Sequence, residues 1–515
     1  MRLAELVVAL SLATDLGLGQ PLEHVLRSTA IALRIGERTG LEPERRSALF
    51  HVGMLSFVGC TVDGGELADL FGDDIAFRAA TYDVDTAGIP MLGFLLRQAA
   101  AGGPPAQRAR ALAALVATGP GRIQRAMLAH CQATGGLAER FGLGGEVRRA
   151  LQHAFARWDG KGLPPEASRD AIEPLARIVH IAEITEVAHR SGGTEAVAEV
   201  ARERSGRQFD PDLAAELAKA GDELFAGLDE LDWPALIESE PGLRDRLPAD
   251  RLDDALEAIA DFCDLRSLQF AGHSRSVADL ASAAALTSGL GEGESATVRR
   301  AALLQDLGRA GVSATIWDKP GPLSPGEWER VRLHTYFTER MLARPPVLAA
   351  IGELAAAHHE RMDGSGYHRG LAGSAVPAAA RLLAAADVHR AVQERRAHRP
   401  PAAAADADRL LRSEAKAGRL DADAVDAVLA AAAGRGHASR RRGSGPAGLT
   451  PREVEVLRML ATGVRNRDVA EALHISRKTV ATHVEHIYAK AGVSTRAGAA
   501  LFAMRHGLVD AEKIG

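Results

Sequence analysis

The chain has 515 residues, of which 46% are hydrophobic and only 4% aromatic, and its formal net charge is −5. One hydrophobic core seldom organises a chain of this length, and the scarcity of aromatic and β-branched runs favours helices over strands. The three cysteines, Cys60, Cys131 and Cys263, lie far apart without a CxxC pair. They indicate reduced thiols in a cytoplasm, not a disulfide framework or a zinc–cysteine site.

The N-terminal segment MRLAELVVALSLATDLG resembles a signal peptide only in its apolar run. Glu5 interrupts that run, and a helical pattern continues past Asp15. The segment therefore predicts a buried amphipathic helix. No run of about 18 apolar residues occurs in the chain, so we expect no membrane span and a cytoplasmic protein.

Two stretches of the chain repeat at an offset of 204 residues. ARWDGKGLP at 156–164 is similar to ERMDGSGYH at 360–368, and ARIVHIAEI at 176–184 is similar to ARLLAAADV at 380–388. Two copies of one helical domain explain this pattern better than chance does. The first copy carries about 50 additional residues, which include the loop AAAGGPPAQ.

The repeat and the helix-breaking segments predict the domain organisation. We place the first copy at 1–225 and the second at 251–433, with a linker at 226–250 where DWP and EPG break the helices. A basic linker follows at 434–448, and a C-terminal domain occupies 449–515. The expected fold class is all-α, with two related helical domains in tandem and a small C-terminal helical domain.

The second copy contains histidines and carboxylates in an arrangement that indicates a metal site. Histidine and carboxylate together suit manganese, iron or zinc, a carboxylate can bridge two ions, and adjacent histidines can face two ions. The candidate ligands are His273, Asp306, His334, His358, His359 and Asp387.

These residues place the second copy in a known family by resemblance. Residues 251–433 resemble the HD-GYP domain, through the QDLGR segment, HHERMDGSGY at 358–367 and AAADV at 384–388. The resemblance implies a fold that hydrolyses cyclic di-GMP or related phosphodiesters, with the six candidate ligands holding iron or manganese, or zinc. It also places Arg309 where the family has a lysine that faces the substrate phosphate, so Asp306 and Arg309 become the candidate catalytic residues.

Gln305 departs from that family pattern, because the resembling domains have a histidine at this position. An amide oxygen is a weak neutral ligand, and losing one ion would remove several kcal/mol of transition-state stabilisation. The sequence therefore leaves three functions open. The HD-GYP-like region is a ligand or nucleotide sensor, a metal-dependent phosphodiesterase, or a dimerisation scaffold.

The first copy resembles the same domain with more replacements. Histidines remain at three ligand positions, and other residues replace the remaining ligands. The retained histidines are His24, His51 and His130, and the replacements are Val52, Ala154, Phe155 and Glu183. Apolar side chains cannot ligate a metal, so we expect this copy to be structural or ligand-sensing and not catalytic.

The linker GRGHASRRRGSGPAG is rich in glycine, lacks acids and shows no periodicity, which predicts flexibility. Its residues Arg440, Arg441 and Arg442 fit either an arm on DNA phosphates or a solvated tether. From Gly434 to the end the chain has 14 Lys and Arg against 7 Asp and Glu, whereas the rest of the chain is acidic. This asymmetry predicts a polyanionic partner for the C-terminal part only.

The C-terminal domain has the sequence pattern of a helix-turn-helix. Thr450 and Glu453 form a capping box, and Ser476 caps a third helix whose apolar positions recur at helical spacing. The segments LTPRE, DVAEALHIS, TVATHV and IYAKAGV resemble the LuxR-type helix-turn-helix domain.

That resemblance implies a recognition helix at 476–490 and binding to double-stranded DNA as a homodimer. Thr479 and His483 are expected to contact backbone phosphates, and Ala481 and Thr482 allow close approach to bases. The candidate contact residues are Arg477, Lys478, Thr479, Ala481, Thr482, His483 and Glu485. Together these features predict a transcriptional regulator controlled by a cyclic dinucleotide or another phosphate-containing ligand.

Overall fold

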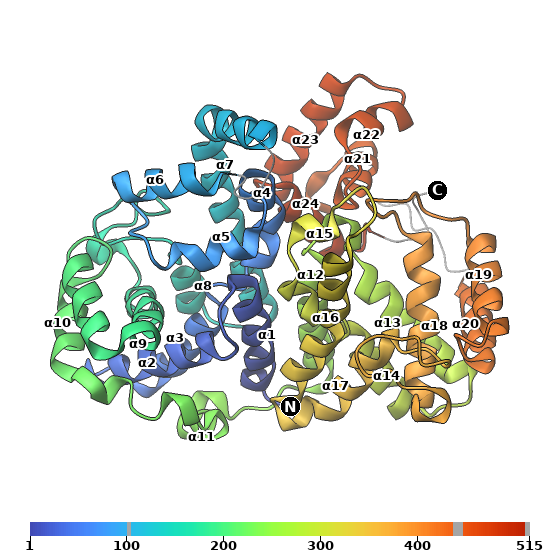
Figure 1. The fold of residues 1–515 in the computed structure, drawn as a ribbon, viewed down its shortest axis with the longest axis horizontal. Helices are drawn as coiled ribbons and strands as arrows, with labels where there is room; N and C mark the ends of the chain where they lie inside the picture. The colour runs from blue at the N-terminus through green and yellow to red at the C-terminus, as the bar shows by residue number, and fades with distance from the viewer. Residues whose placement is uncertain (100–104, 436–445, 510–515) are drawn as a thin grey trace. The chain divides into compact units, whose positions relative to one another are not determined.

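The computed structural model describes residues 1–99, 105–435 and 446–509 (Figure 1). These residues form α-helices and short 3-10 helices, and the only β pairing among them consists of isolated bridges. The predicted all-α class is therefore confirmed. The predicted basic arm, Arg440 to Arg442, and residues 100–104 of the first copy's loop lie outside the described part of the chain.

Within the described residues the chain forms two compact units, Met1–Leu252 and Asp253–Gly515. The helices of the first unit are α1 Leu3–Leu18, α2 His24–Arg38, α3 Pro43–Leu55, α4 Cys60–Phe71, α5 Asp74–Thr81, α6 Gly88–Gln98, α7 Pro105–Arg140, α8 Gly145–Gln152, α9 Pro174–Arg204, α10 Pro211–Ala220 and α11 Trp233–Ser239. In this unit α2 packs against α3 and α9, and α4 packs against α7.

The N-terminal helix α1 is buried along most of its length, as the sequence predicted. One described stretch, Pro43–Phe71, is long and apolar enough by composition to cross a membrane, but 83% of its most apolar window is buried inside the structure. Burial of that kind is what a core element shows. The segment predicted as a linker, 226–250, contains α11, whose Trp233 and Ile237 are buried, and it lies within the first unit.

The second unit contains the second copy and the C-terminal domain. Its helices are α12 Ala249–Asp264, which begins at the boundary, α13 His273–Thr287, α14 Glu292–Leu304, α15 Ala314–Trp317, α16 Pro325–Ala343, α17 Ala349–Ala356, α18 Ala378–Gln393, α19 Ala404–Lys416, α20 Ala422–Arg435, α21 Pro451–Ala461, α22 Asn466–Ala472, α23 Arg477–Ala491 and α24 Arg496–Arg505. Helix α13 packs against α14, α18 and α20, and α16 packs against α17 and the 3-10 helix η6, Leu307–Gly311.

The internal repeat of the sequence is also a repeat of hydrogen bonds. In each copy the backbone amide two residues after the start of the first repeated stretch, Trp158 or Met362, donates to a carbonyl near the end of the copy. In each copy an arginine, Arg177 or Arg381, also donates from its Nε to the carbonyl of the residue five positions before it. The pairs are Trp158 to Gln208 at 3.2 Å and Met362 to Arg419 at 3.0 Å, and Arg177 to Ile172 at 3.1 Å and Arg381 to Val376 at 2.8 Å. Equivalent residues making equivalent bonds support a duplicated domain.

The additional residues of the first copy form α4, α5, α6 and the beginning of α7. They lie between His51 and His130, which the repeat aligns with Gln305 and His334 of the second copy. The extra segment thus enters the part of the fold where the second copy has its candidate metal site.

Close packing at Gly308 holds the segment after α14 against α16. A Cβ atom at this position would lie 2.0 Å from the carbonyl oxygen of His334, whereas a Cβ at Gly321 would meet nothing within 4 Å. The backbone of α16 cannot withdraw without moving His334. Only glycine permits this approach.

We expect Gly308→Ala to lower the thermal midpoint of the second unit by about 5 °C or more, because overpacking against backbone costs roughly 1–3 kcal/mol or more. Circular dichroism measures the transition. Gly321→Ala is the matched control and should leave the midpoint nearly unchanged. Equal midpoints for both variants would contradict the packing argument.

Candidate metal centre and nucleic-acid interface

The structure brings the six predicted metal ligands together inside the second unit. His273 is the first residue of α13, Asp306 follows α14, and His334 lies on α16. The remaining ligands come from the 3-10 helix η8, Ala357–His359, and from α18, which carries Asp387. All six side chains are buried except that of His359, which is 16% exposed.

Two of the ligands, His334 and His358, face each other, and a backbone hydrogen bond to each ring fixes which nitrogen carries the proton. Nδ1 of His334 donates to the carbonyl of Val331 at 2.5 Å, and Nδ1 of His358 donates to the carbonyl of Ala355 at 2.7 Å. Each Nε2 therefore keeps its lone pair, and the two Nε2 atoms are 3.4 Å apart. Backbone bonds of this kind fix the tautomer of metal-ligating histidines.

Asp306 completes a triangle with these two histidines. Its Oδ1 lies 3.4 Å from Nε2 of His334 and 3.6 Å from Nε2 of His358. A tetrahedron with edges of this length has its centre about 2.1 Å from each corner, which is the distance at which nitrogen and carboxylate oxygen bind zinc. Oδ1 is buried and has no hydrogen-bond partner. The triangle therefore fits one cation.

His359 stands beside this triangle. It forms a cluster of candidate ligand atoms with His334 and His358, all within 4.8 Å of one another. Burial, together with the neighbouring His358, holds the pKa of His359 well below its usual value, and its Nδ1 has no hydrogen-bond partner. A neutral ring with a free lone pair can serve as a further ligand.

The other side of the site is closed by protein groups. Nε2 of His273 lies 3.1 Å from Asp387, and its Nδ1 lies 2.9 Å from Glu394. Although burial opposes protonation, these two carboxylates raise the pKa of His273 to about 10. Gln305 reaches toward Asp306 and Asp387 at 3.4 and 3.5 Å, and its Oε1 has no partner.

Arg309 binds the ligand carboxylate directly. Its Nη2 lies 2.8 Å from Oδ2 of Asp306, and its guanidinium stacks 4.0 Å above Phe270 and 5.7 Å from Trp317. Although burial alone would raise it, the pKa of Asp306 is held well below its usual value by Arg309 and the histidines. The Nε and Nη1 of Arg309 are buried without acceptors, so two donors remain for a bound oxyanion.

Sequence reasoning missed Glu394, Phe270 and Trp317. Glu394 directly follows the end of α18, seven residues after Asp387, where the backbone is already extended, so helical periodicity did not point to it. The two aromatic residues come from segments with no motif. His368 does not replace the missing histidine at Gln305 as a ligand, since its ring contacts Thr335 at 3.0 Å and Glu339 at 2.9 Å.

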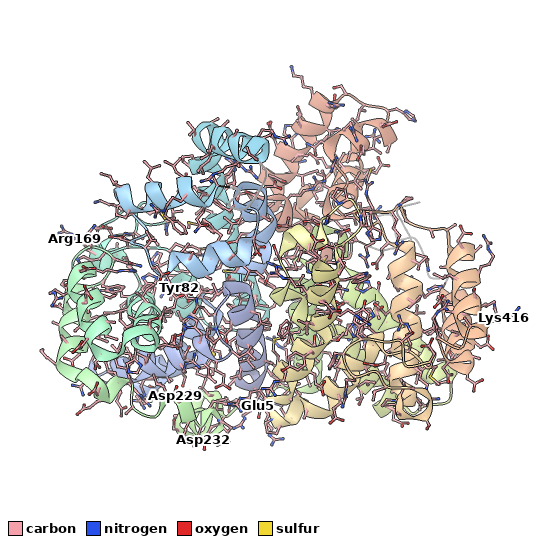
Figure 2. All side chains as sticks on the ribbon, in the orientation of Figure 1. Glu5, Tyr82, Arg169, Asp229, Asp232 and Lys416 are labelled. Atoms are coloured by element: carbon pink, nitrogen blue, oxygen red, sulfur yellow. The ribbon has the colours of Figure 1, made fainter. Side chains whose placement is uncertain are left out.

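In the first unit, two of the three retained histidines are engaged by other groups. Nδ1 of His24 lies 2.6 Å from Glu186, and Nδ1 of His51 donates to Ser47 at 2.9 Å. Tyr82, at the end of α5 (Figure 2), donates to Glu183, whose pKa burial raises to about 8. Residues from the additional segment thus occupy the place of the metal site.

The recognition helix predicted at 476–490 is α23. Ser476 caps it by accepting from the Thr479 amide at 3.0 Å, and Val480 and Ile487 are fully buried. The capping box of Thr450 and Glu453 is present at α21. The predicted contact residues Arg477, Lys478, Thr479, Ala481, Thr482 and Glu485 are exposed, and His483 is half-buried.

Comparisons with known proteins agree with both parts. Residues 257–424 match the family of HD domains, and residues 447–503 match the bacterial regulatory proteins of the luxR family. The chain is 28% identical over 402 residues to 3′3′-cGAMP-specific phosphodiesterase 3 of Vibrio cholerae serotype O1, covering 77% of this chain and 87% of the relative. An uncharacterized transcriptional regulatory protein of Bacillus subtilis is 48% identical over 61 residues, which are 12% of this chain and 28% of that protein.

A crystal structure of cyclic GMP-AMP specific phosphodiesterases from V. cholerae shares the fold, with a TM-score of 0.59 and 23% identity over 84% of this chain and 98% of the other. The HD-GYP and LuxR resemblances are therefore confirmed. The chain combines an HD domain with a LuxR-type helix-turn-helix domain.

The converging lone pairs predict that His358→Ala removes one metal ion per chain from protein purified without a chelator. Elemental analysis by mass spectrometry measures the loss. Asp406→Ala, which removes an exposed carboxylate on α19 of the same unit, should keep the wild-type metal content. Identical metal content in all three proteins would show that the histidine triangle holds no ion.

Proposed function

We propose that this chain, with its HD domain and LuxR-type helix-turn-helix domain, is a cytoplasmic transcriptional regulator. Its HD region binds a cyclic dinucleotide or a related phosphate-containing ligand and controls the binding of double-stranded DNA. The observation that carries this proposal is the HD site, in which Arg309 and Gln305 contact Asp306 and leave coordination space for one cation. The same chain exposes the polar face of α23, the proposed recognition helix.

The DNA-binding part rests on exposure and charge. Arg477 and Lys478 lie in the first turn of α23 with their side chains exposed, where they can reach phosphates or base edges. Thr479 and His483 are placed to contact the phosphate backbone, and Ala481 and Thr482 are small enough for close approach. Domains that resemble this one bind DNA as dimers, so we infer a homodimer on DNA.

The ligand-binding part rests on Arg309. The buried guanidinium has two donors without acceptors, and the aromatic faces of Phe270 and Trp317 hold it in place. Charged N–H donors of this kind each form strong hydrogen bonds to phosphate oxygens. His334, His358, His359 and Asp306 would hold one iron, manganese or zinc ion, which would supply Lewis-acid polarisation of a phosphate oxygen.

Sensing without turnover is favoured over hydrolysis by the closed side of the site. A phosphodiesterase that uses two ions clamps both the attacking and the leaving oxygen. Here His273 is bonded to Asp387 and Glu394, and Gln305 stands where resembling domains have a histidine. These contacts leave coordination space for one cation at His334, His358 and Asp306, and none for a second cation.

Hydrolysis is the second candidate function. The observation that favours it is the presence of six ligand positions in one site, together with the similarity to a 3′3′-cGAMP-specific phosphodiesterase. In that case Asp306 and Arg309 would be the catalytic residues. A dimerisation scaffold for the DNA-binding domain is the third candidate, and it requires neither ligand nor metal.

For DNA binding, we expect Lys478→Ala to weaken affinity for a random-sequence duplex and to reduce the slope of log affinity against log salt by roughly one. Fluorescence anisotropy at several salt concentrations measures both. Lys416→Ala, an exposed lysine of α19 (Figure 2), is the control and should keep the wild-type slope. If the wild-type protein binds no duplex at low salt, the DNA-binding proposal is wrong.

For the HD site, we expect the metal-loaded protein to bind 3′3′-cGAMP or cyclic di-GMP without forming a linear product. Calorimetry measures affinity, and chromatography detects product. Arg309→Ala should lower affinity at least tenfold, about 1.4 kcal/mol, because the phosphate loses its paired donors. Arg412→Ala, on the exposed face of α19, should bind as the wild type does.

The other outcomes of that experiment separate the three candidate functions. Linear product from the wild-type protein would establish the phosphodiesterase and overturn the sensor. Product from Gln305→His alone would show that the glutamine is what stops turnover. Absence of binding for both nucleotides would leave the scaffold.

A further inference from the structure

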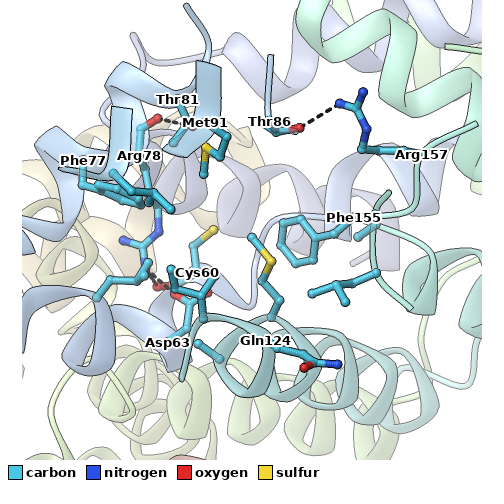
Figure 3. A pocket seen from close by; sticks show the side chains of 18 of the residues that line it. Cys60, Asp63, Phe77, Arg78, Thr81, Thr86, Met91, Gln124, Phe155 and Arg157 are labelled. Carbon is cyan, nitrogen blue, oxygen red and sulfur yellow. Dashed lines mark hydrogen bonds and ion pairs between the residues drawn. The ribbon is translucent and has the colours of Figure 1, made fainter. Parts of the chain in front are cut away.

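The first unit contains a cavity of about 750 Å³ that the function proposed above does not use (Figure 3). Its walls are mostly apolar and include Phe77, Met91, Leu95 and Phe155. The additional segment of the first copy supplies much of this lining. Several polar side chains also line the cavity, and two of them, Cys60 and Asp63, lie close together.

Cys60 and Asp63 form a cluster with His130, which lies behind them. One candidate ligand atom from each residue lies within 4.8 Å of the others, and all three residues are buried. Cys60 and Asp63 occupy the first turn of α4, three residues apart, so they share a face of the helix. His130 reaches them from α7, which packs against α4.

The orientation of His130 is fixed from behind. Its Nε2 donates to the carbonyl of Ser56 at 2.7 Å, so Nδ1 is the ring nitrogen whose proton a cation would replace. Nδ1 is buried, has no hydrogen-bond partner and lies 3.6 Å from Oδ2 of Asp63. Gly59 permits this approach, because a Cβ there would lie 2.6 Å from Cγ of His130.

Asp63 is oriented in the same way. Arg78 pairs with Oδ1 of Asp63 and, at 2.7 Å, with Asp74, which leaves Oδ2 directed toward His130. Charged partners behind a carboxylate are the usual support of a metal ligand. With a thiolate at Cys60, the ion-paired groups carry three negative charges and one positive charge, so a divalent cation would make the cluster neutral.

We propose that Cys60, Asp63 and His130 bind one divalent cation of the zinc class in the first unit. This site is separate from the HD site and uses two residues outside the HD-GYP pattern. Thiolate, imidazole and carboxylate together are the donors that zinc takes, and a separation near 3.6 Å between nitrogen and oxygen agrees with bonds of about 2.0–2.2 Å.

Cys60 is the first residue of the 12-residue helix α4, and its side chain lines the cavity. Because Cys60 and Asp63 both line the cavity, the coordination position that the protein leaves open faces it. Water or the donor group of an apolar molecule would complete the site.

Cobalt(II) is the probe that tests this proposal, since it replaces zinc and its spectrum reports thiolate bonds. The full chain carrying His358→Ala, which lacks the triangle of the HD site, is titrated with cobalt. We expect one equivalent to produce a thiolate-to-cobalt charge-transfer band and the visible bands of a tetrahedral site. Absence of the charge-transfer band in this parent protein would overturn the proposal, whatever the variants do.

Two cysteine variants in the same parent assign the ligand. Cys60→Ser should abolish the charge-transfer band, and Cys131→Ser, a buried cysteine next to His130 but outside the cluster, should keep it. Zinc should raise the thermal midpoint of the parent and of Cys131→Ser, and should not raise that of Cys60→Ser or His130→Ala. A band that survives Cys60→Ser would place the thiolate elsewhere and overturn the assignment.

Discussion

The buried carboxylate of Asp306 is the constraint on which the second unit depends. An ionised carboxylate in a protein interior is costly unless charged or hydrogen-bonding partners surround it. Arg309 engages one oxygen, and His334 and His358 converge on the other. Gly308 lets the chain pass close enough to α16 for this to happen. The side chain of Asp306 therefore divides the site into two halves. Arg309 closes one half, and the half at His334 and His358 is open to a bound cation.

The two copies show how one helical scaffold serves different chemistry. Both place a histidine at the start of a helix, His24 in α2 and His273 in α13, each after a residue with positive φ. In the second copy that histidine meets ligand carboxylates, whereas in the first it pairs with Glu186. The segment inserted in the first copy brings Tyr82 into the old site and opens a new cavity beside it.

The C-terminal domain follows a simpler rule. Its capped helices bury Val480 and Ile487 and leave the polar face of α23 exposed to solvent, because the packing of the domain does not require that face. In the HD domain the functional groups are buried and satisfy one another. This difference explains why the polar face of α23 was recognisable in the sequence as an exposed helical face, while the distances and hydrogen bonds around Asp306 were not.

The sequence by itself determined the all-α class, the duplication, the six histidine and carboxylate positions of the HD site and the helix-turn-helix, because each of these is written in local periodicity, capping or motif spacing. It also exposed Gln305 as a departure. Only the tertiary structure decided that Arg309 bonds Asp306, that Glu394 supports His273, and that Cys60 and Asp63 meet His130. The contacts of Glu394 and of His130 join residues on different elements. Arg309 follows Asp306 by only three residues, but whether their side chains pair depends on how the surrounding elements pack, which no local pattern specifies.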